Sequence, residues 1–171
     1  MLFRSSTLLK LSRLEAGVVE LKQESISVVR LANEVCEKLE LNAEWSQVEL
    51  NVDIPDEIEI LGDFQWLAEA VLNIVKNAIE HSTTGSVVEL RADDNDVYTL
   101  LTVHNWGAKI PDEEQRHLFE RFYRGGSARS DSVGIGLALA KEIVDRLGGY
   151  ITVESQEENG TFFFIKFLKC H

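Results

Sequence analysis

The segment Val133–Lys141, with the sequence VGIGLALAK, constrains the fold more than any other part of the chain. Gly134 and Gly136 stand one residue apart, and the apolar pattern after them predicts an amphipathic helix. Glycine lets a backbone approach a ligand closely, and the free N–H groups in the first turn of a helix attract an anion. This junction therefore suits phosphate, although many helices begin after glycine for conformational reasons alone.

Composition predicts one compact domain that does not bind nucleic acid. The chain has 171 residues, 44% of them hydrophobic, and a formal net charge of −12. A duplex DNA partner requires a basic footprint, which this sequence lacks. No window of about 18 apolar residues occurs, and the first ten residues do not resemble a signal peptide. We therefore expect no nucleic acid partner, no direct membrane contact by this segment and a cytoplasmic location.

Hydrophobic periodicity predicts an α+β fold. Helices are expected over residues 30–43, 64–81 and 135–147, and a short helix in the loop region 107–133. Strands are expected over residues 25–28, 48–54, 58–61, 86–92, 97–104, 150–155 and 161–168. These elements predict a two-layer α/β sandwich, in which about three helices cover one face of a mixed, mostly antiparallel sheet.

The first twenty residues differ from the rest of the chain. Leucines recur at roughly helical spacing between Leu8 and Leu14, and Gly17 follows as a helix stop. A helix this short is marginal alone, so residues 1–20 are predicted to be the tail of a preceding helical domain, and residues 21–171 the domain itself. The alternative is a short N-terminal helix that folds onto its own domain.

Two asparagines share one face of the predicted helix 64–81. Asn73 and Asn77 are four residues apart, on a different face from the apolar stripe. Asparagine is a mediocre helix former, and its side-chain oxygen is a hard neutral ligand that suits Mg²⁺. The competing interpretation is that both side chains simply hydrogen-bond to neighbouring structure.

A second polar position lies at the end of a predicted strand. Asn105 can offer one hydrogen-bonding group to a flat heterocycle, and Gly107 lets such a ring come close. Phe119 and Phe122 follow, at a spacing that usually anchors a loop in the core. The small, polar residues 125–132 are typical of a lid.

These segments, taken in order, resemble the ATP-binding domain of sensor histidine kinases. They are Asn73-x-x-x-Asn77, Asn105-x-Gly107, Phe119-Glu120-Arg121-Phe122 and Gly134-x-Gly136-Leu137. In the wider family shared with Hsp90, MutL and gyrase, they correspond to the asparagine, first glycine, phenylalanine and second glycine boxes. The resemblance covers residues 25–168, and residues 10–17 look like the end of the second helix of the family's dimerisation and phosphoacceptor hairpin.

The resemblance implies an Mg-ATP site. Asn77, with Asn73, would coordinate Mg²⁺, Asn105 would face the adenine amino group, and the second glycine box would offer backbone N–H groups to the phosphates. No catalytic side chain is implied. The residues assigned to ATP are Asn73, Asn77, His81, Asn105, Gly107, Ile110, Phe119, Arg124, Arg129, Gly134, Gly136 and Leu137.

Four positions depart from the family pattern. Asn105 replaces an aspartate, Lys109 and Ala138 replace glycines, and Glu80 stands where many relatives carry a basic residue. A neutral amide accepts a weaker hydrogen bond than a carboxylate, so Asn105 is expected to cost ATP affinity on the order of 1 kcal/mol.

The expected reaction is phosphoryl transfer rather than hydrolysis. Asn73 stands where ATP-hydrolysing relatives carry a glutamate, and an amide cannot act as a base at neutral pH. None of the four histidines occupies the family's phosphoacceptor position, so the chain is not expected to phosphorylate itself. They are His81, His104, His117 and His171.

The resemblance also implies partners. They are the phosphoacceptor helical domain of the same kinase and the receiver domain of a response regulator, within a homodimeric, membrane-anchored bacterial sensor. Two alternatives stay open: a weakly nucleotide-binding or non-catalytic module that acts by docking, and a serine kinase or anti-sigma factor on the same fold.

Overall fold

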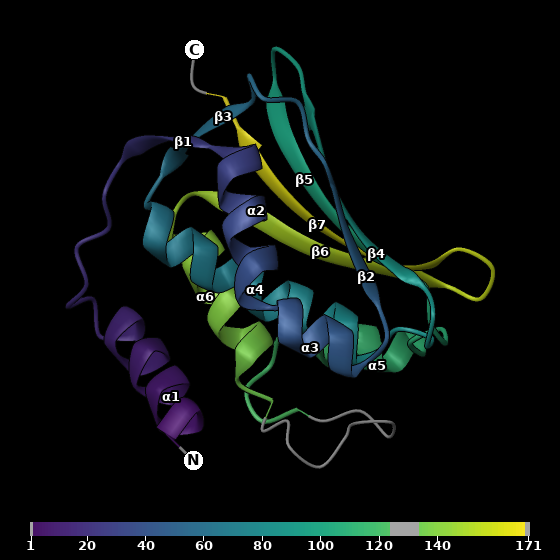
Figure 1. The fold of residues 1–171 in the computed structure, drawn as a ribbon. Coiled ribbons are helices and arrows are strands. Elements are labelled where there is room, and N and C mark those ends of the chain that lie inside the picture. Colours follow the sequence, from purple (N-terminus) through teal and green to yellow (C-terminus); the bar gives the residue numbers. More distant parts are fainter. Residues whose placement is uncertain (1, 124–133, 170–171) are drawn as a thin grey trace.

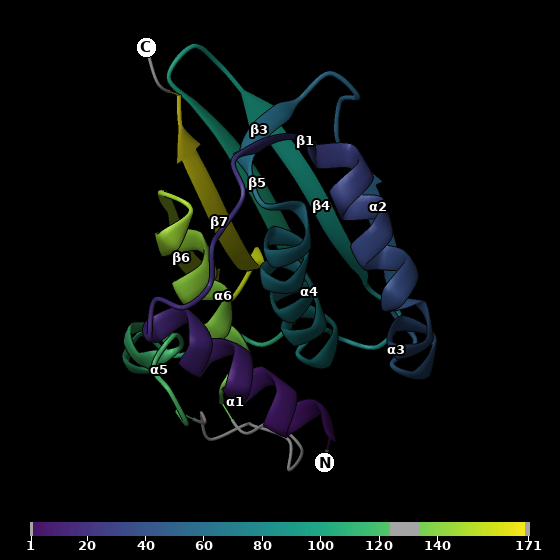
Figure 2. The same cartoon turned by 90° about the vertical axis from the view of Figure 1, so that its left-hand side faces the viewer.

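A five-stranded sheet forms one layer of the fold, and helices cover one of its faces (Figures 1 and 2). The computed structural model describes residues 2–123 and 134–169. Across the sheet, the strands run in the order β2 (Glu49–Asp53), β4 (Val87–Asp94), β5 (Tyr98–Asn105), β7 (Gly160–Leu168) and β6 (Gly149–Gln156). Only the β2–β4 pair of this sheet is parallel. The predicted mixed, mostly antiparallel sheet is confirmed.

The helix layer is centred on α4 (Phe64–Glu80), which contacts α2 (Val28–Lys38) on one side and α6 (Gly136–Arg146) on the other. Asp63 caps α4: one carboxylate oxygen accepts the Trp66 N–H at 3.2 Å, and the other accepts the Lys22 N–H at 3.0 Å. Two short helices complete the layer, α3 (Glu40–Trp45) and α5 (Asp112–His117). The apolar stripe of α4 lies in the core, so this helix fixes the positions of the others. Its members are Leu67, Val71, Ile74 and Ala78.

One local prediction differs from the structure, and one pairing was left open by the sequence. The single helix predicted over residues 30–43 is wrong, because the chain turns at Leu39 and divides it into α2 and α3, which keeps both Leu39 and Ala43 buried. The strands predicted over residues 48–54 and 58–61 exist but do not pair with each other. The second of them, β3 (Glu59–Gly62), instead forms a separate antiparallel ribbon with β1 (Glu24–Ser27).

The N-terminal helix α1 (Leu2–Glu15) packs onto α6 (Figure 2). Leu11 and Leu14 are both buried, and the helix ends before Gly17, whose φ of +72° suits glycine. The helix α1 therefore buries its leucines against the helix layer.

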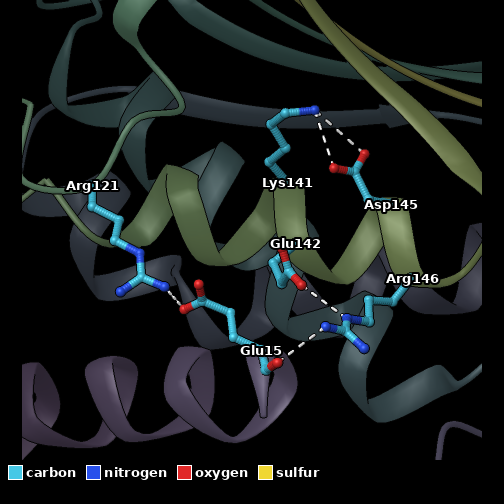
Figure 3. A network of polar contacts seen from close by, with 6 residues as sticks. All are labelled: Glu15, Arg121, Lys141, Glu142, Asp145 and Arg146. Atoms are coloured by element: carbon cyan, nitrogen blue, oxygen red, sulfur yellow. Dashed lines mark hydrogen bonds and ion pairs between the residues drawn. The ribbon is translucent and has the colours of Figure 1, made fainter. Parts of the chain in front are cut away.

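Polar contacts flank the buried leucines of α1. Lys10 pairs with Glu69 of α4 at 3.2 Å. At the other end, the Glu15 carboxylate pairs with Arg121, and its backbone carbonyl accepts a hydrogen bond from Arg146 at 3.5 Å (Figure 3). No helix within residues 2–123 and 134–169 has the length and apolar character needed to cross a bilayer.

We expect Leu14→Ala to lower the free energy of unfolding by about 2 to 4 kcal/mol, because it removes a buried side chain and leaves a cavity under α1. Leu9→Ala is the matched control, since Leu9 lies on the same helix but is 52% exposed; its effect should stay within about 0.5 kcal/mol. Urea denaturation measures both. Equal effects would show that α1 does not pack onto the domain in solution.

Candidate functional site

Three of the four sequence segments meet where α4 ends, β5 ends and α6 begins. A Cβ atom at Gly136 would lie 3.0 Å from Asn73 Oδ1, so the start of α6 lies directly against α4. A Cβ atom at Gly107 would overlap the His81 carbonyl oxygen, so the segment after β5 lies against the end of α4. The Thr83 N–H also donates to the Trp106 carbonyl at 2.7 Å. The asparagine and two glycine segments therefore form one site.

Asn73 presents its oxygen to the beginning of α6. Its Nδ2 donates to the Glu69 carbonyl at 3.0 Å, within α4, which leaves Oδ1 beside Gly136. Helix α6 has no side-chain cap hydrogen bond at Ile135, and the first N–H groups of a helix have no partner within the helix itself. A hard oxygen and a set of backbone N–H donors thus lie next to each other.

Asn77 lies one turn further along the same face of α4. It is half-buried, and its side-chain amide forms no hydrogen bond with any residue the structure describes. Lys76, its neighbour, is exposed. The two asparagines therefore differ: Asn73 is held in place by its own helix, whereas the Asn77 amide is not held.

Asn105 is buried at the end of β5. The residue is only 2% exposed, yet its side-chain amide makes no hydrogen bond within the described part of the chain. Since no fully buried side-chain polar atom there lacks a partner, the unbonded part of this amide reaches solvent. Gly107 lies beside it, because a Cβ at position 107 would be 3.3 Å from Asn105 Nδ2. The side-chain amide of Asn105 therefore lies next to backbone that carries no side chain.

The phenylalanine segment adjoins the start of α6. The Phe122 N–H donates to the Gly134 carbonyl at 2.9 Å, and a Cβ at Gly134 would lie 2.5 Å from the Tyr123 carbonyl oxygen. Phe119 packs edge-on against Phe163 in the core, at 6.2 Å between ring centroids, while Phe122 is exposed. Only Phe119 therefore anchors this segment.

The positions that depart from the family pattern have distinct surroundings. Lys109 pairs with Asp112 at the start of α5, at 3.5 Å. Glu80 is half-buried in the last turn of α4, and Ala138 is buried in α6. His81 is the C-cap of α4, and its N–H donates to the Asn77 carbonyl. Arg124 and Arg129 lie outside the described residues.

A charged cluster lies between α5 and the phenylalanine segment. His117 Nδ1 is 2.7 Å from the Glu120 carboxylate, and Glu113 lies 3.5 Å from Nε2 of the same ring. The hydrogen bond to Glu120 raises the pKa of His117, and Glu113 adds to this effect. Its imidazole therefore keeps its proton to a higher pH than an ordinary histidine.

Sequence reasoning missed two residues near the site. Ser155 and Thr161 are both buried on the helix-covered face of the sheet, and the Ile110 N–H donates to Ser155 Oγ at 2.9 Å. The pattern that could have revealed them is a polar residue at an inward position of an otherwise apolar alternation, such as Ser155 after Ile151 and Val153.

Residues 62–170 match the family of histidine kinase-, DNA gyrase B- and HSP90-like ATPases. The chain belongs to this family. Among curated members, the sensor-like histidine kinase SenX3 of Mycobacterium tuberculosis is 31% identical over 159 residues, which are 91% of this chain and 39% of SenX3. The heme sensor protein HssS of Staphylococcus saprophyticus is 34% identical over 80% of this chain and 30% of HssS. The chain thus spans well under two thirds of these relatives.

Solved structures of the ATPase family share the fold. The Acinetobacter baumannii histidine kinase AdeS superposes with a TM-score of 0.81 at 20% identity, over 98% of this chain and 77% of that chain. The mycobacterial sensor histidine kinase MprB superposes with a TM-score of 0.74 at 27% identity, over 85% and 97% of the two chains. The α+β arrangement is therefore that of histidine kinase ATPase domains.

We expect Gly107→Ala to destabilise this ATPase-family domain by about 1 to 3 kcal/mol, because the new methyl group overlaps a backbone oxygen that cannot rotate away. Gly62→Ala is the control: its Cβ would lie 3.5 Å from Ile26, an ordinary contact, and its effect should stay below about 1 kcal/mol. Thermal unfolding compares the two. An equally mild effect at both positions would contradict the close approach of the two segments.

Proposed function

We propose that this chain is the ATP-binding kinase domain of a sensor histidine kinase. It would transfer the γ-phosphoryl group of Mg-ATP to a histidine on a separate phosphoacceptor domain of the same kinase. The observation that carries the proposal is the meeting of the α4 asparagine face, the Asn105–Gly107 pair and the glycine-rich start of α6. The sensor kinases among the relatives favour this function over a docking module without catalysis.

The residues at the α4–α6 contact fit a magnesium–phosphate group. Asn73 and Asn77 supply neutral oxygens of the kind Mg²⁺ accepts, and Gly134, Gly136 and Leu137 supply backbone N–H groups at a helix start without a side-chain cap. A side chain at position 136 would press on Asn73 Oδ1, so glycine lets the start of α6 lie close to this oxygen. Metal coordination by Asn77 and Asn73 is part of the proposal.

The residues after β5 fit a purine base. The unbonded amide of the buried Asn105 is suited to accept a hydrogen bond from an exocyclic amine. Gly107 lets the segment after β5 lie directly against the end of α4, beside this amide. Ile110 and His81 border this segment, and Phe119 anchors the chain that follows. Arg124 and Arg129 complete the proposed set as phosphate contacts.

Positioning explains the proposed chemistry, because phosphoryl transfer needs little covalent help from the protein. ATP supplies the phosphoryl group, and the acceptor histidine supplies the nucleophile. This chain would hold the phosphates with backbone N–H groups and the metal with side-chain amides. It would offer no base at position 73 to activate a water molecule. Asn73 cannot activate water, which favours transfer over hydrolysis.

The proposal extends to the rest of the protein. Residues 1–20 would be the tail of the dimerisation and phosphoacceptor helix, and residues 21–171 the catalytic domain. The expected partners are that helical domain and a response regulator receiver domain, and the full-length protein would be a homodimer. We place the catalytic domain in the cytoplasm, with a membrane anchor elsewhere in the protein.

The decisive experiment adds labelled ATP and Mg²⁺ to this chain together with the separate phosphoacceptor hairpin. Label on a histidine of the hairpin is expected. Binding of ATP without transfer would support the non-catalytic docking module instead, and label on a serine of a partner would support the serine kinase alternative.

Asn77→Ala should lower the rate of transfer at least about 100-fold, which corresponds to about 2.7 kcal/mol of barrier, because it removes a proposed metal ligand. Lys76→Ala is the matched control, since its side chain is exposed on the next position of the same helix. The label-transfer assay measures both, after thermal unfolding has shown that both variants fold. Unchanged transfer in Asn77→Ala would defeat the metal assignment.

A further inference from the structure

The described residues include only five buried polar side chains, and three of them form a row across the sheet. Asn105, Thr161 and Ser155 are 2%, 3% and 7% exposed. Asn105 pairs with Thr161 between β5 and β7, and Thr161 pairs with Ser155 between β7 and β6. All three lie at the end of the sheet where the candidate site is. The other two, Asp63 and Thr99, have local partners, in the cap of α4 and at Asp94.

The row of buried polar side chains ends at Ser155, which bonds to the backbone of Ile110, a few residues after Asn105 and Gly107. Ser155 Oγ is 2.7 Å from Thr161 Oγ1 and accepts the Ile110 N–H at 2.9 Å. The Ile110 carbonyl in turn accepts a hydrogen bond from Gln115 Nε2 of α5, at 2.7 Å. Ile110 is therefore fastened on one side to the sheet and on the other to α5.

Few bonds hold the segment between Asn105 and Ile110. It has no helix or strand of its own, and Trp106, Ala108 and Lys109 are exposed. The Thr83–Trp106 hydrogen bond holds its beginning, and the Ser155–Ile110 hydrogen bond holds its end. Loss of the second bond would leave the half that contains Gly107 tied to α5 alone, through Gln115, and would also leave the buried Thr161 hydroxyl without its partner.

We propose that Ser155 is a positioning residue that fixes residues 107–110 for the nucleotide base through the Ile110 N–H. This inference rests on the proposed function, since it assumes that Asn105 and Gly107 receive the base. Ser155 makes no contact with the base itself, because its hydroxyl acts through the backbone of Ile110. Its influence is therefore confined to the base and does not extend to the phosphates held at α6.

The test compares Ser155→Ala with two other variants by calorimetry, using Mg-ATP and, as a ligand without a base, magnesium tripolyphosphate. Ser155→Ala should weaken Mg-ATP binding about five- to tenfold and leave tripolyphosphate binding unchanged. Ser155→Thr keeps the hydroxyl and should restore ATP affinity. Thr99→Val removes an equally buried hydroxyl at the far end of β5 and should leave both affinities unchanged.

A second readout is independent of nucleotide. The Ile110 amide should exchange with solvent at least about tenfold faster in Ser155→Ala than in the wild-type chain or Thr99→Val, because its acceptor is gone. Unchanged ATP affinity, or an equal loss for ATP and tripolyphosphate, would overturn the positioning role. If the wild-type chain bound no ATP, the proposed function would fail instead, and the exchange of Ile110 would still decide whether Ser155 holds the segment.

Discussion

The close contact between α4 and α6 at Asn73 and Gly136 is the constraint on which the site depends. The buried stripe of α4 places this helix in the middle of its layer, and α6 packs along it. Their separation at the site is set by the absence of a side chain at position 136, where a Cβ would lie 3.0 Å from Asn73 Oδ1. This contact brings amide oxygens and uncapped backbone N–H groups together, and the other parts of the site are arranged around it.

The sequence predicted most of the elements because their local patterns were strong. The apolar periodicity of α4 and α6 is strong, and alternation of apolar and polar residues marks the long strands of the sheet. The pairing of β2 was harder to foresee, because parallel pairing with β4 joins strands that are distant in sequence and leaves no local trace. The turn at Leu39 was missed because helical periodicity continues through it.

The polar and glycine positions of the candidate site could be proposed from the sequence. The residues that hold these positions in place could not. Asn73, Gly107 and Gly136 stand out because a helix or strand seldom carries such residues without a reason. Phe119 and Phe122 looked equivalent in sequence, yet only Phe119 reaches the core, since that choice depends on the distant Phe163. Ser155 lies 45 residues from Ile110, so no local pattern joins them.

The most direct test of the account is a backbone and side-chain amide NMR titration of this chain with Mg-ATP. If Mg-ATP binds at the proposed site, the largest chemical-shift changes should fall at Asn73, Asn77, Asn105–Gly107 and Gly134–Leu137. These residues belong to three segments that only the fold brings together. The aromatic stack of His104 and Phe162, on the uncovered face of the sheet, should change little. Saturable binding would contradict the proposed Mg-ATP site if the chemical-shift changes fell on that uncovered face and the signals of residues at the α4–α6 contact did not move.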